Sequence, residues 1–281
     1  MSRYEPKVMY PMDLDSTVAA QNPPDYPLRF LAEGDSWFSF GSWKLSSYLN
    51  MLRFKVPTAI VTLAEPGALI VRMSTIAQNA ELDHWLDANW GAFKWNAVLI
   101  SGGGNDLIDA AGTIITPSAL TQPVKPADQY VSKVELDKVL AAITASYQRI
   151  VALRDRPSSP CVGVPLITHD YDLSTPRNAP ARFLVPMLGP WLYPAMVAAK
   201  IPASEWNAVS DHLLGELGQC LISLESTLPN FHVARTQGTL RRAALDTTGV
   251  SNDWDNEIHP RPEGYRKVGV VLTDLIESLT L

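Results

Sequence analysis

The sequence predicts a three-layer α/β/α sandwich, in which helices cover both faces of a parallel sheet. Five short apolar segments of strand length alternate with longer segments of helical periodicity along the chain. Polar residues that can do chemistry follow three of these apolar segments, and the carboxyl ends of parallel strands meet at one edge of a sheet. With 281 residues, of which 46% are hydrophobic and 19% are charged, the chain has the length and composition of a globular domain.

The strand and helix signals alternate in chain order. The predicted strands are 28–32, 58–64, 97–100, 162–167 and 231–234. Apolar residues near helical spacing predict helices over about 68–90, 133–153, 204–224 and from 262 almost to the C-terminus. Pro165 interrupts the fourth strand and indicates an edge position or a bend, because proline cannot donate to a sheet ladder.

Two segments stand apart from this alternation. Residues 1–27 are rich in proline and polar groups and predict an extended arm over the surface. Residues 28–281 then form a single domain. Within it, the segment 168–203 is apolar but broken by prolines, which predicts a cap or pocket wall above the sheet.

The charge and hydropathy patterns exclude several classes of partner. The net charge of −6 and the pI near 5.4 give no electrostatic support to nucleic-acid binding. No run of 18 or more apolar residues predicts a transmembrane segment. Residues 1–12 lack the apolar stretch of a Sec signal, so the expected location is the cytoplasm by default, with export by a signal-independent route left open.

The cysteines and glycines indicate neither a disulfide framework nor a cofactor. Cys161 and Cys220 lack metal-ligand spacing and are expected to be small buried hydrophobes. The glycines at 102–104 are not followed by the Lys-Ser/Thr pair of a phosphate-binding loop. We therefore expect no cofactor and no metal, and the oligomeric state is not predicted.

Ser36 is the candidate nucleophile. Gly34-Asp35-Ser36 directly follows the first predicted strand, so the serine hydroxyl is exposed at the end of the sheet. The alternative is that Asp35 and Ser36 only cap a helix. A serine hydroxyl at neutral pH needs a base within hydrogen-bond reach before it can attack.

His259 is the candidate base, and Asn105 the candidate oxyanion donor. His259 precedes the last helix in a loop punctuated by proline and glycine; alternatively it is an exposed loop residue. Asn105 follows the glycines after the third strand, where its amide can donate to a developing oxyanion or cap a turn. Gly67, after the second strand, can add a backbone N–H to the same hole or serve only as a turn glycine.

These motifs resemble the four blocks of the SGNH (GDSL-type) hydrolase superfamily over residues 28–279. The resemblance implies a flavodoxin-like sheet of five parallel strands in the order 2-1-3-4-5, and metal-independent ester hydrolysis. It also implies that Ser36 attacks, that His259 acts as base and then acid, and that the oxyanion hole comprises the Ser36 N–H, the Gly67 N–H and the Asn105 side chain. The matching residues are Gly34-Asp35-Ser36, Gly67, Gly103-Gly104-Asn105-Asp106 and His259.

The chain departs from the superfamily pattern three residues before the histidine. The superfamily has aspartate there, whereas this chain has Asn256, with Asp255 one place earlier. An aspartate would orient the imidazole and stabilise its protonated form. Asn256 can still hold the ring through its amide oxygen, and Asp255 can replace it only if the loop turns differently. A Ser–His dyad helped by a backbone carbonyl is the third possibility.

Other residues are expected near the substrate. Trp37 and Trp191 are the two tryptophans expected at the pocket, and His169 and Tyr171 are expected to line it. A metal site in the run His169-Asp170-Tyr171-Asp172 is the less favoured interpretation, because no second histidine cluster completes it.

Together these observations predict a serine hydrolase that cleaves a small-molecule or lipid-like ester through an acyl-enzyme on Ser36. One alternative is a catalytically weak or inactive binding protein with the same fold, suggested by the missing aspartate. The other is metal-assisted hydrolysis through the acidic run after the fourth strand.

Overall fold

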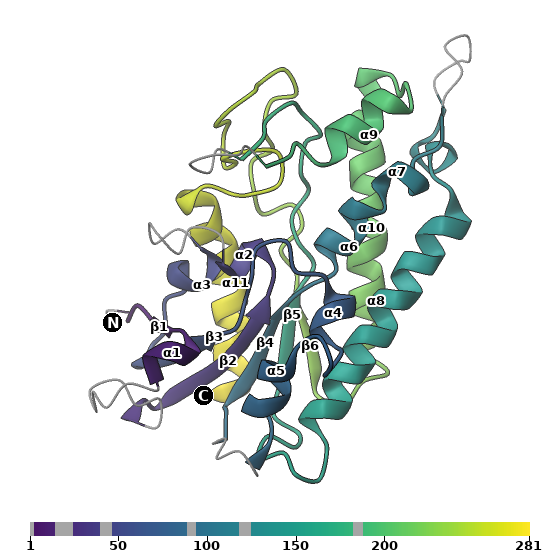
Figure 1. Ribbon diagram of the computed structural model, residues 1–281. Coiled ribbons are helices and arrows are strands. Elements are labelled where there is room, and N and C mark those ends of the chain that lie inside the picture. Colours follow the sequence, from purple (N-terminus) through teal and green to yellow (C-terminus); the bar gives the residue numbers. More distant parts are fainter. Residues whose placement is uncertain (1–2, 15–24, 40–46, 89–93, 118–124, 182–187) are drawn as a thin grey trace.

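The computed structural model describes residues 3–14, 25–39, 47–88, 94–117, 125–181 and 188–281 (Figure 1). Its centre is a sheet of six parallel strands in the order β1-β3-β2-β4-β5-β6. The strands are β1 (Lys7–Met9), β2 (Leu28–Gly34), β3 (Thr58–Thr62), β4 (Ala97–Ser101), β5 (Leu166–His169) and β6 (Phe231–Ala234). The five strands predicted from the sequence keep the expected order 2-1-3-4-5, and β1 adds a sixth at the edge beside β3.

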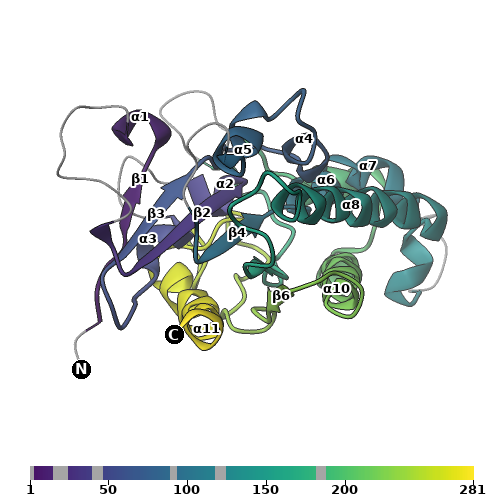
Figure 2. The same ribbon diagram turned by 90° about the horizontal axis from the view of Figure 1, so that it is seen from below.

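Helices cover both faces of the sheet, as the α/β/α prediction requires. Figure 2 shows α4, α5 and α8 on one side and α11 on the other. The main helices are α4 (Ile70–Met73), α5 (Ala80–Trp85), α8 (Lys133–Arg154), α10 (Trp206–Leu224) and α11 (Pro262–Thr280). Helix α10 packs against both α8 and β6, and α11 packs against the short helix α3 (Tyr48–Met51).

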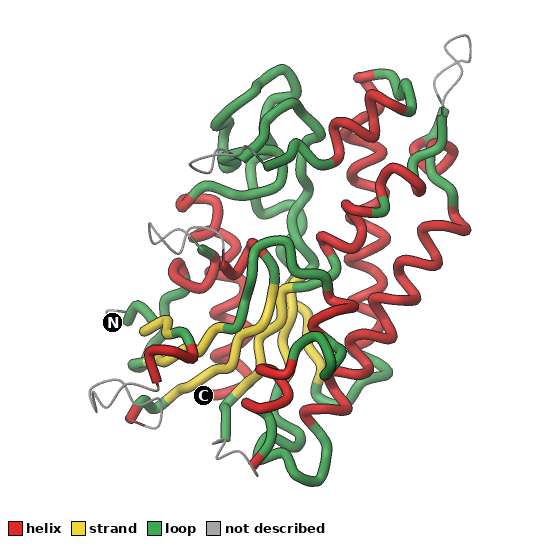
Figure 3. Tube along the Cα trace, in the orientation of Figure 1, coloured by secondary structure: helices red, strands yellow, loops and turns green. Residues whose placement is uncertain are grey.

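Shorter helices connect these elements and surround the carboxyl end of the sheet. Figure 3 shows that long loops, coloured green, lie beyond this end. The short helices are α1 (Pro11–Leu14), α2 (Ser36–Ser39), α6 (Gly104–Asp109), α7 (Ala111–Ile114), α9 (Leu192–Ala198) and the 3-10 helices η4 (Ala127–Tyr130) and η5 (Ala203–Glu205). None of the described helices combines the length and hydropathy that crossing a bilayer requires.

The arm predicted at residues 1–27 contributes to the sheet. Its residues 7–9 form β1, which pairs in parallel with β3, and Met9 is fully buried. Burial of this methionine anchors the arm to the core. Residues 15–24 of the arm lie outside the described part of the chain.

The single long helix predicted over about 68–90 is wrong. The described part of this segment holds two short helices, α4 and α5, separated by turns. Asn79 interrupts the helix, because its Oδ1 accepts the N–H of Leu82 at 3.1 Å and its Nδ2 donates to the Glu33 carboxylate at 2.7 Å. The cap and the contact with β2 together outweigh the helical periodicity of the segment.

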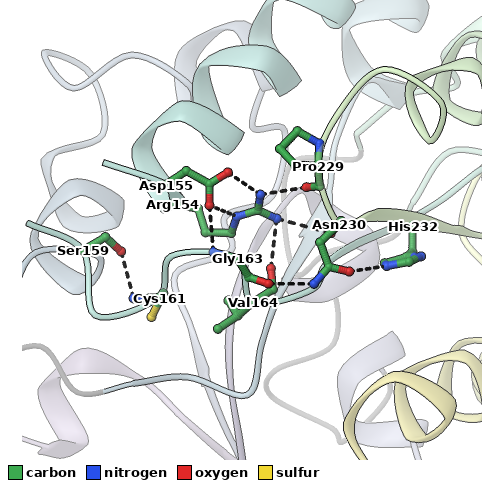
Figure 4. Close-up of polar contacts among 9 residues, drawn as sticks. All are labelled: Arg154, Asp155, Ser159, Cys161, Gly163, Val164, Pro229, Asn230 and His232. Carbon is green, nitrogen blue, oxygen red and sulfur yellow. Dashed lines mark hydrogen bonds and ion pairs between the residues drawn. The ribbon is translucent and has the colours of Figure 1, made fainter. Parts of the chain in front are cut away.

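The fourth strand begins later than predicted and lies inside the sheet, between β4 and β6. Its predicted start at residue 162 is wrong, because residues 161–163 form a turn in which the Val164 N–H donates to the Cys161 carbonyl at 3.1 Å. The Arg154 guanidinium binds backbone carbonyls beside this turn (Figure 4). Arg154 donates to the carbonyl of Val164 at 2.9 Å and to that of Pro229 at 2.7 Å, which ties α8 to the starts of β5 and β6. Pro165 precedes the strand, where its missing N–H costs no ladder bond. The predicted edge position is therefore wrong.

The remaining elements agree closely with the sequence patterns. Helix α8 extends one residue beyond the predicted 133–153, and α11 begins at Pro262 as predicted. Helix α10 begins at Trp206, after the 3-10 turn of η5, instead of at residue 204. Neither Cys161 nor Cys220 forms a disulfide.

Candidate active site

The site lies where β2, β4 and β5 end, at Gly34, Ser101 and His169. Two of these strands approach each other closely because residue 34 is glycine: a Cβ there would lie 2.8 Å from the Cβ of Ser101. The backbone N–H of Asp35 donates to the Ser101 carbonyl at 3.0 Å, which extends the pairing by one residue. The chain then turns into α2, and Ser36 is its first residue.

The structure brings the candidate nucleophile and base together. The Nε2 atom of His259 lies 2.8 Å from the Oγ atom of Ser36, although 223 positions separate them in the sequence. Only 6% of Ser36 and 2% of His259 is exposed. This distance lies within hydrogen-bond reach, which is the geometric requirement for a general base.

The loop before α11 holds His259 in place. The N–H of Asp255 donates to the His259 carbonyl at 2.9 Å, and the N–H of Arg261 donates to the Asp253 carbonyl at 2.9 Å. Gly264 allows this close fold, because a Cβ there would lie 2.4 Å from the carbonyl oxygen of Asp253. Pro262 then occupies the first turn of α11, where its missing N–H costs nothing.

Asn256 contacts the far side of the imidazole. Its Oδ1 lies 3.0 Å from Nδ1 of His259 and also accepts the backbone N–H groups of Ile258 and His259. These backbone donors make Oδ1 an acceptor, so Nδ1 carries the proton and Nε2 is left to accept one from Ser36. Asp255, the other residue expected to orient the ring, is exposed. It contacts His259 by a hydrogen bond from its backbone N–H to the His259 carbonyl.

Burial controls the charge of His259. It lowers the pKa of the imidazole from 6.5 to about 3, because a buried ring is costly to protonate. His259 is therefore neutral near pH 7, the state in which it can take a proton.

A small cavity of about 30 Å³ adjoins Ser36. Asn105 lines it together with Ser36, so a polar donor and the hydroxyl face the same space. Its aliphatic lining comes from four different parts of the chain: Ile108, Leu192, Leu214 and Ile258.

Asn105 and Gly67 lie at neighbouring loops but in different surroundings. The Nδ2 group of Asn105 donates to the Ala68 carbonyl at 3.1 Å, which joins the loop after β3 to the start of α6. Gly67 has a φ of 79°, a conformation that favours glycine. It is exposed and borders a second cleft, of about 800 Å³, which Glu33 and Asn79 also line.

The four residues expected near the substrate take different positions. Trp37 and Tyr171 line the cavity beside Ser36. The ring of Trp191 stands edge-on to His259, with centroids 5.3 Å apart. His169 is fully buried beneath the cavity and stacks on Trp37, with centroids 5.1 Å apart.

The carboxylates of the run after β5 bind the backbone. Asp170 accepts the N–H of Thr236 at 2.6 Å, and Asp172 accepts the N–H of Gly238 at 2.7 Å. These bonds hold the loop after β6 against the loop after β5. Within the described ranges, no three His, Cys, Asp or Glu side chains are grouped as a metal site would need.

Two acidic residues near the site were not identified from the sequence. The sequence predicts Asp35 only as a helix cap, whereas its carboxylate accepts three hydrogen bonds beneath Ser36. Glu257 is fully buried, and its carboxylate accepts the backbone N–H groups of Trp191, Leu192 and Tyr193 at the start of α9. In the sequence, these two acidic residues could have been found only from their positions next to Ser36 and Asn256.

The chain is similar to several solved esterase structures at low identity. The Clostridium thermocellum family 3 carbohydrate esterase has 13% identity and a TM-score of 0.44, over 90% of this chain and 99% of that one. A carbohydrate acetylesterase from Sinorhizobium meliloti has 13% identity and a TM-score of 0.41, over 90% and 99%. The M. smegmatis aryl esterase has 13% identity and a TM-score of 0.42, also over 90% and 99%. Comparison with curated protein sequences gives no match.

The family comparison is decisive, because one family model covers most of the chain. The model described as GDSL-like Lipase/Acylhydrolase matches residues 15–271, a range that includes Ser36, Asn105 and His259. This chain therefore belongs to the GDSL-like lipase and acylhydrolase family.

Proposed function

We propose that the protein hydrolyses an ester through an acyl-enzyme on Ser36. The hydroxyl oxygen of Ser36 attacks the ester carbonyl carbon while Nε2 of His259 takes the hydroxyl proton. The resulting imidazolium gives this proton to the leaving alkoxide, which departs as the alcohol. The observation that carries the proposal is the 2.8 Å contact between His259 Nε2 and Ser36 Oγ, with the opposite ring nitrogen bound to Asn256.

The second half of the reaction uses the same two groups. Water replaces the alcohol, Nε2 of His259 takes one of its protons, and the oxygen attacks the acyl carbon. When the tetrahedral intermediate collapses, the proton on His259 returns to Ser36 Oγ and the carboxylic acid leaves. His259 thus acts as base and then acid in both halves.

Three donors are proposed for the oxyanion. The Ser36 N–H lies at the first position of α2, where an N–H has no partner within its own helix. The Asn105 amide has a second N–H beyond the one given to Ala68, and its side chain lines the cavity. The Gly67 N–H is the third, and the Asn105–Ala68 bond supports its inclusion by linking the two loops. Such donors typically contribute about 10²- to 10³-fold each to the rate.

Substitution of the nucleophile tests the proposal. Ser36→Ala should abolish hydrolysis of p-nitrophenyl acetate and labelling by a fluorophosphonate, while circular dichroism shows an intact fold. Ser223→Ala, at an exposed serine of α10, is the matched control and should retain both. His259→Ala should lose turnover, whereas His232→Ala, at β6, should not. Full turnover by the Ser36 variant would reject the mechanism.

The same experiment separates the alternatives suggested by the sequence. A binding protein without activity would leave the folded wild type unlabelled by the fluorophosphonate. Metal-assisted hydrolysis would be lost on treatment with a chelator and restored by a divalent ion. The proposed serine mechanism expects labelling and no effect of the chelator.

A further inference from the structure

A chain of buried polar side chains lies directly beneath Ser36. The carboxylate of Asp35 accepts the hydroxyl of Tyr171 at 2.5 Å and the hydroxyl of Ser101 at 2.8 Å. The Ser101 hydroxyl in turn lies 2.9 Å from Nε2 of His169. All four side chains are at most 4% exposed. The mechanism above uses none of them.

In this hydrogen-bonded series of side chains, every hydrogen bond is directed toward Asp35. The backbone N–H of Tyr171 lies 3.3 Å from Nδ1 of His169, which makes Nδ1 the acceptor. Burial lowers the pKa of His169 to about 3, so the ring is neutral and its one proton sits on Nε2. Nε2–H then donates to Ser101 Oγ, and the Ser101 hydroxyl donates to Asp35. Asp35 is therefore an acceptor from every partner, which suits a carboxylate and not a neutral acid.

This arrangement has the residue types of a catalytic triad but cannot act as one. Asp35 contacts the serine and not the histidine, so it does not orient the ring of His169. Ser101 is fully buried, so no substrate reaches its hydroxyl. These hydrogen bonds instead have a structural role.

The part that these hydrogen bonds hold in place is the turn that presents Ser36. The Asp35 carboxylate also accepts the N–H of Trp37 at 3.0 Å, and the Asp35 carbonyl accepts the N–H groups of Phe38 and Ser39 at 3.1 Å. The peptide between Asp35 and Ser36 is thus held on both sides: the Asp35 side chain is bonded to the buried groups, and the Asp35 carbonyl is bonded to α2. Tyr171 adds the shortest of the side-chain bonds to this carboxylate, from a backbone held at a φ of 52°.

We propose that Tyr171 is a positioning residue, which holds the ionised carboxylate of Asp35 and through it fixes Ser36 against His259. The proposal rests on the ester hydrolysis proposed above. It makes turnover depend on the ionisation of Asp35, whose carboxylate is bonded to Trp37, Ser101 and Tyr171 and not to the proposed base. It also gives Tyr171 a role beyond the substrate contact expected from the sequence.

The surroundings of Asp35 determine how this dependence should appear. Burial raises the pKa of Asp35 from 3.8 to about 6, and the bonds from Tyr171 and Ser101 oppose the rise. Among the described residues, the titratable groups around Asp35 besides Tyr171 and His169 include Asp106 of α6, Tyr147 of α8 and Tyr265 of α11. Burial keeps both tyrosines neutral by raising the pKa of each, and the charge of Asp106 adds to the rise at Asp35.

Removing one hydroxyl tests the proposal. Tyr171→Phe keeps the ring in the cavity wall but removes the donor, so the pKa of Asp35 should rise further. The acid limb of kcat/KM, expected near pH 6 in the wild type, should move to higher pH. At about pH 6 the variant should lose on the order of tenfold in kcat/KM, and at about pH 9 it should approach the wild type. His259, with a pKa of about 3, does not titrate in this range.

Tyr265→Phe is the matched control. It removes a hydroxyl from the same aromatic cluster, and this hydroxyl has no hydrogen-bond partner among the described residues. Its pH profile should match the wild type. Asp35→Asn, which cannot ionise, should lower turnover at every pH without recovery at high pH. If Tyr171→Phe does not fold, Ser101→Ala removes the other side-chain donor and should move the acid limb in the same direction.

Two results would overturn the inference: an unchanged pH profile in Tyr171→Phe, or a loss of equal size at all pH values. The second would mean that the hydroxyl matters only for packing. Either result with Ser36 still labelled by the fluorophosphonate rejects this inference alone. An unlabelled wild type rejects the proposed function itself.

Discussion

The side-chain oxygen of Asn256 lies 3.0 Å from Nδ1 of His259 and receives two backbone N–H groups at the same time. The amide therefore holds the ring in the tautomer that a general base needs. It supplies no charge to an imidazolium formed during the reaction. Its Nδ2 group is buried and has no hydrogen-bond partner in the described part of the chain, so only one end of the amide is used.

Asn256→Asp should raise the rate constant and lower the stability. A carboxylate at this position stabilises the imidazolium, so the pKa of His259 should rise and kcat near pH 8 should increase by about tenfold. The second carboxylate oxygen would replace the unpartnered Nδ2, which should lower Tm. Asn256→Ala should reduce kcat by on the order of 10²-fold, because the ring loses its fixed orientation. Equal kcat values for all three proteins would contradict this role.

The size of the cavity predicts a preference for short acyl groups. The cavity beside Ser36 is small, at about 30 Å³, so we expect it to accept an acetyl group more readily than a longer chain. Across p-nitrophenyl esters, kcat/KM should fall from acetate to octanoate. Leu214→Ala should open the apolar wall and shift the preference toward longer chains, by up to about fourfold for each methylene accommodated.

Leu213→Ala is the control for this shift, since Leu213 is buried in the same helix but does not line the cavity. It should lower stability by about 2–5 kcal/mol without changing the ratio of rates between esters. A shift of the same size in both variants would mean that general loosening, and not the cavity wall, sets the preference.

Glu257 should give the protein a pH-dependent stability. Burial raises the pKa of its carboxyl from 4.5 to about 7, although backbone N–H groups at the start of α9 oppose the rise. The folded state thus binds this proton more tightly than the unfolded state. The contribution of Glu257 to the free energy of unfolding should therefore decrease as pH rises from about 4.5 to about 7.

Denaturant unfolding of the wild type and Glu257→Gln at several pH values measures this effect. Because glutamine does not titrate, the stability of the wild type relative to the variant should decline across that window by roughly 1.4 kcal/mol per unit of pKa shift. Glu216→Gln, the same exchange at an exposed position of α10, is the matched control. A constant difference between the wild type and Glu257→Gln would contradict the prediction.

Gly104→Ala should disturb Tyr171 without touching its hydroxyl. A Cβ at position 104 would lie 2.9 Å from two carbons of the Tyr171 ring, so the ring must shift. Such overpacking costs about 1–3 kcal/mol and should weaken the bond to Asp35. The acid limb of kcat/KM should move in the same direction as in Tyr171→Phe.

Gly112→Ala is the control, because a Cβ there meets nothing within 4 Å. It lies in the neighbouring helix α7 and should be neutral, or more stable by about 0.5–1 kcal/mol, since alanine favours helix over glycine. A normal pH profile in Gly104→Ala would show that the Tyr171 ring can move without disturbing the turn at Asp35 and Ser36.

The main features of the fold were predictable from local patterns. The strand at 231–234 and the helices that begin at 133 and 262 have strong periodicity or clear ends, and their predicted positions agree with the structure. The helix over 68–90 is interrupted by the Asn79 cap, and the start of the fourth strand by the turn at 161–163. Asn79 and Arg154 each bind groups from other elements there, and periodicity within one segment does not reveal such partners.

Local sequence patterns were enough to predict the α/β/α architecture, the family and the residues proposed for catalysis. Periodicity and short motifs at strand ends are local properties, so they can be read along the chain. Only the tertiary structure shows which groups contact one another: Ser36 with His259, Asn256 with the ring of His259, and the buried side chains that link Asp35 to His169. These contacts join residues up to 223 positions apart, and packing, not sequence spacing, sets their distances.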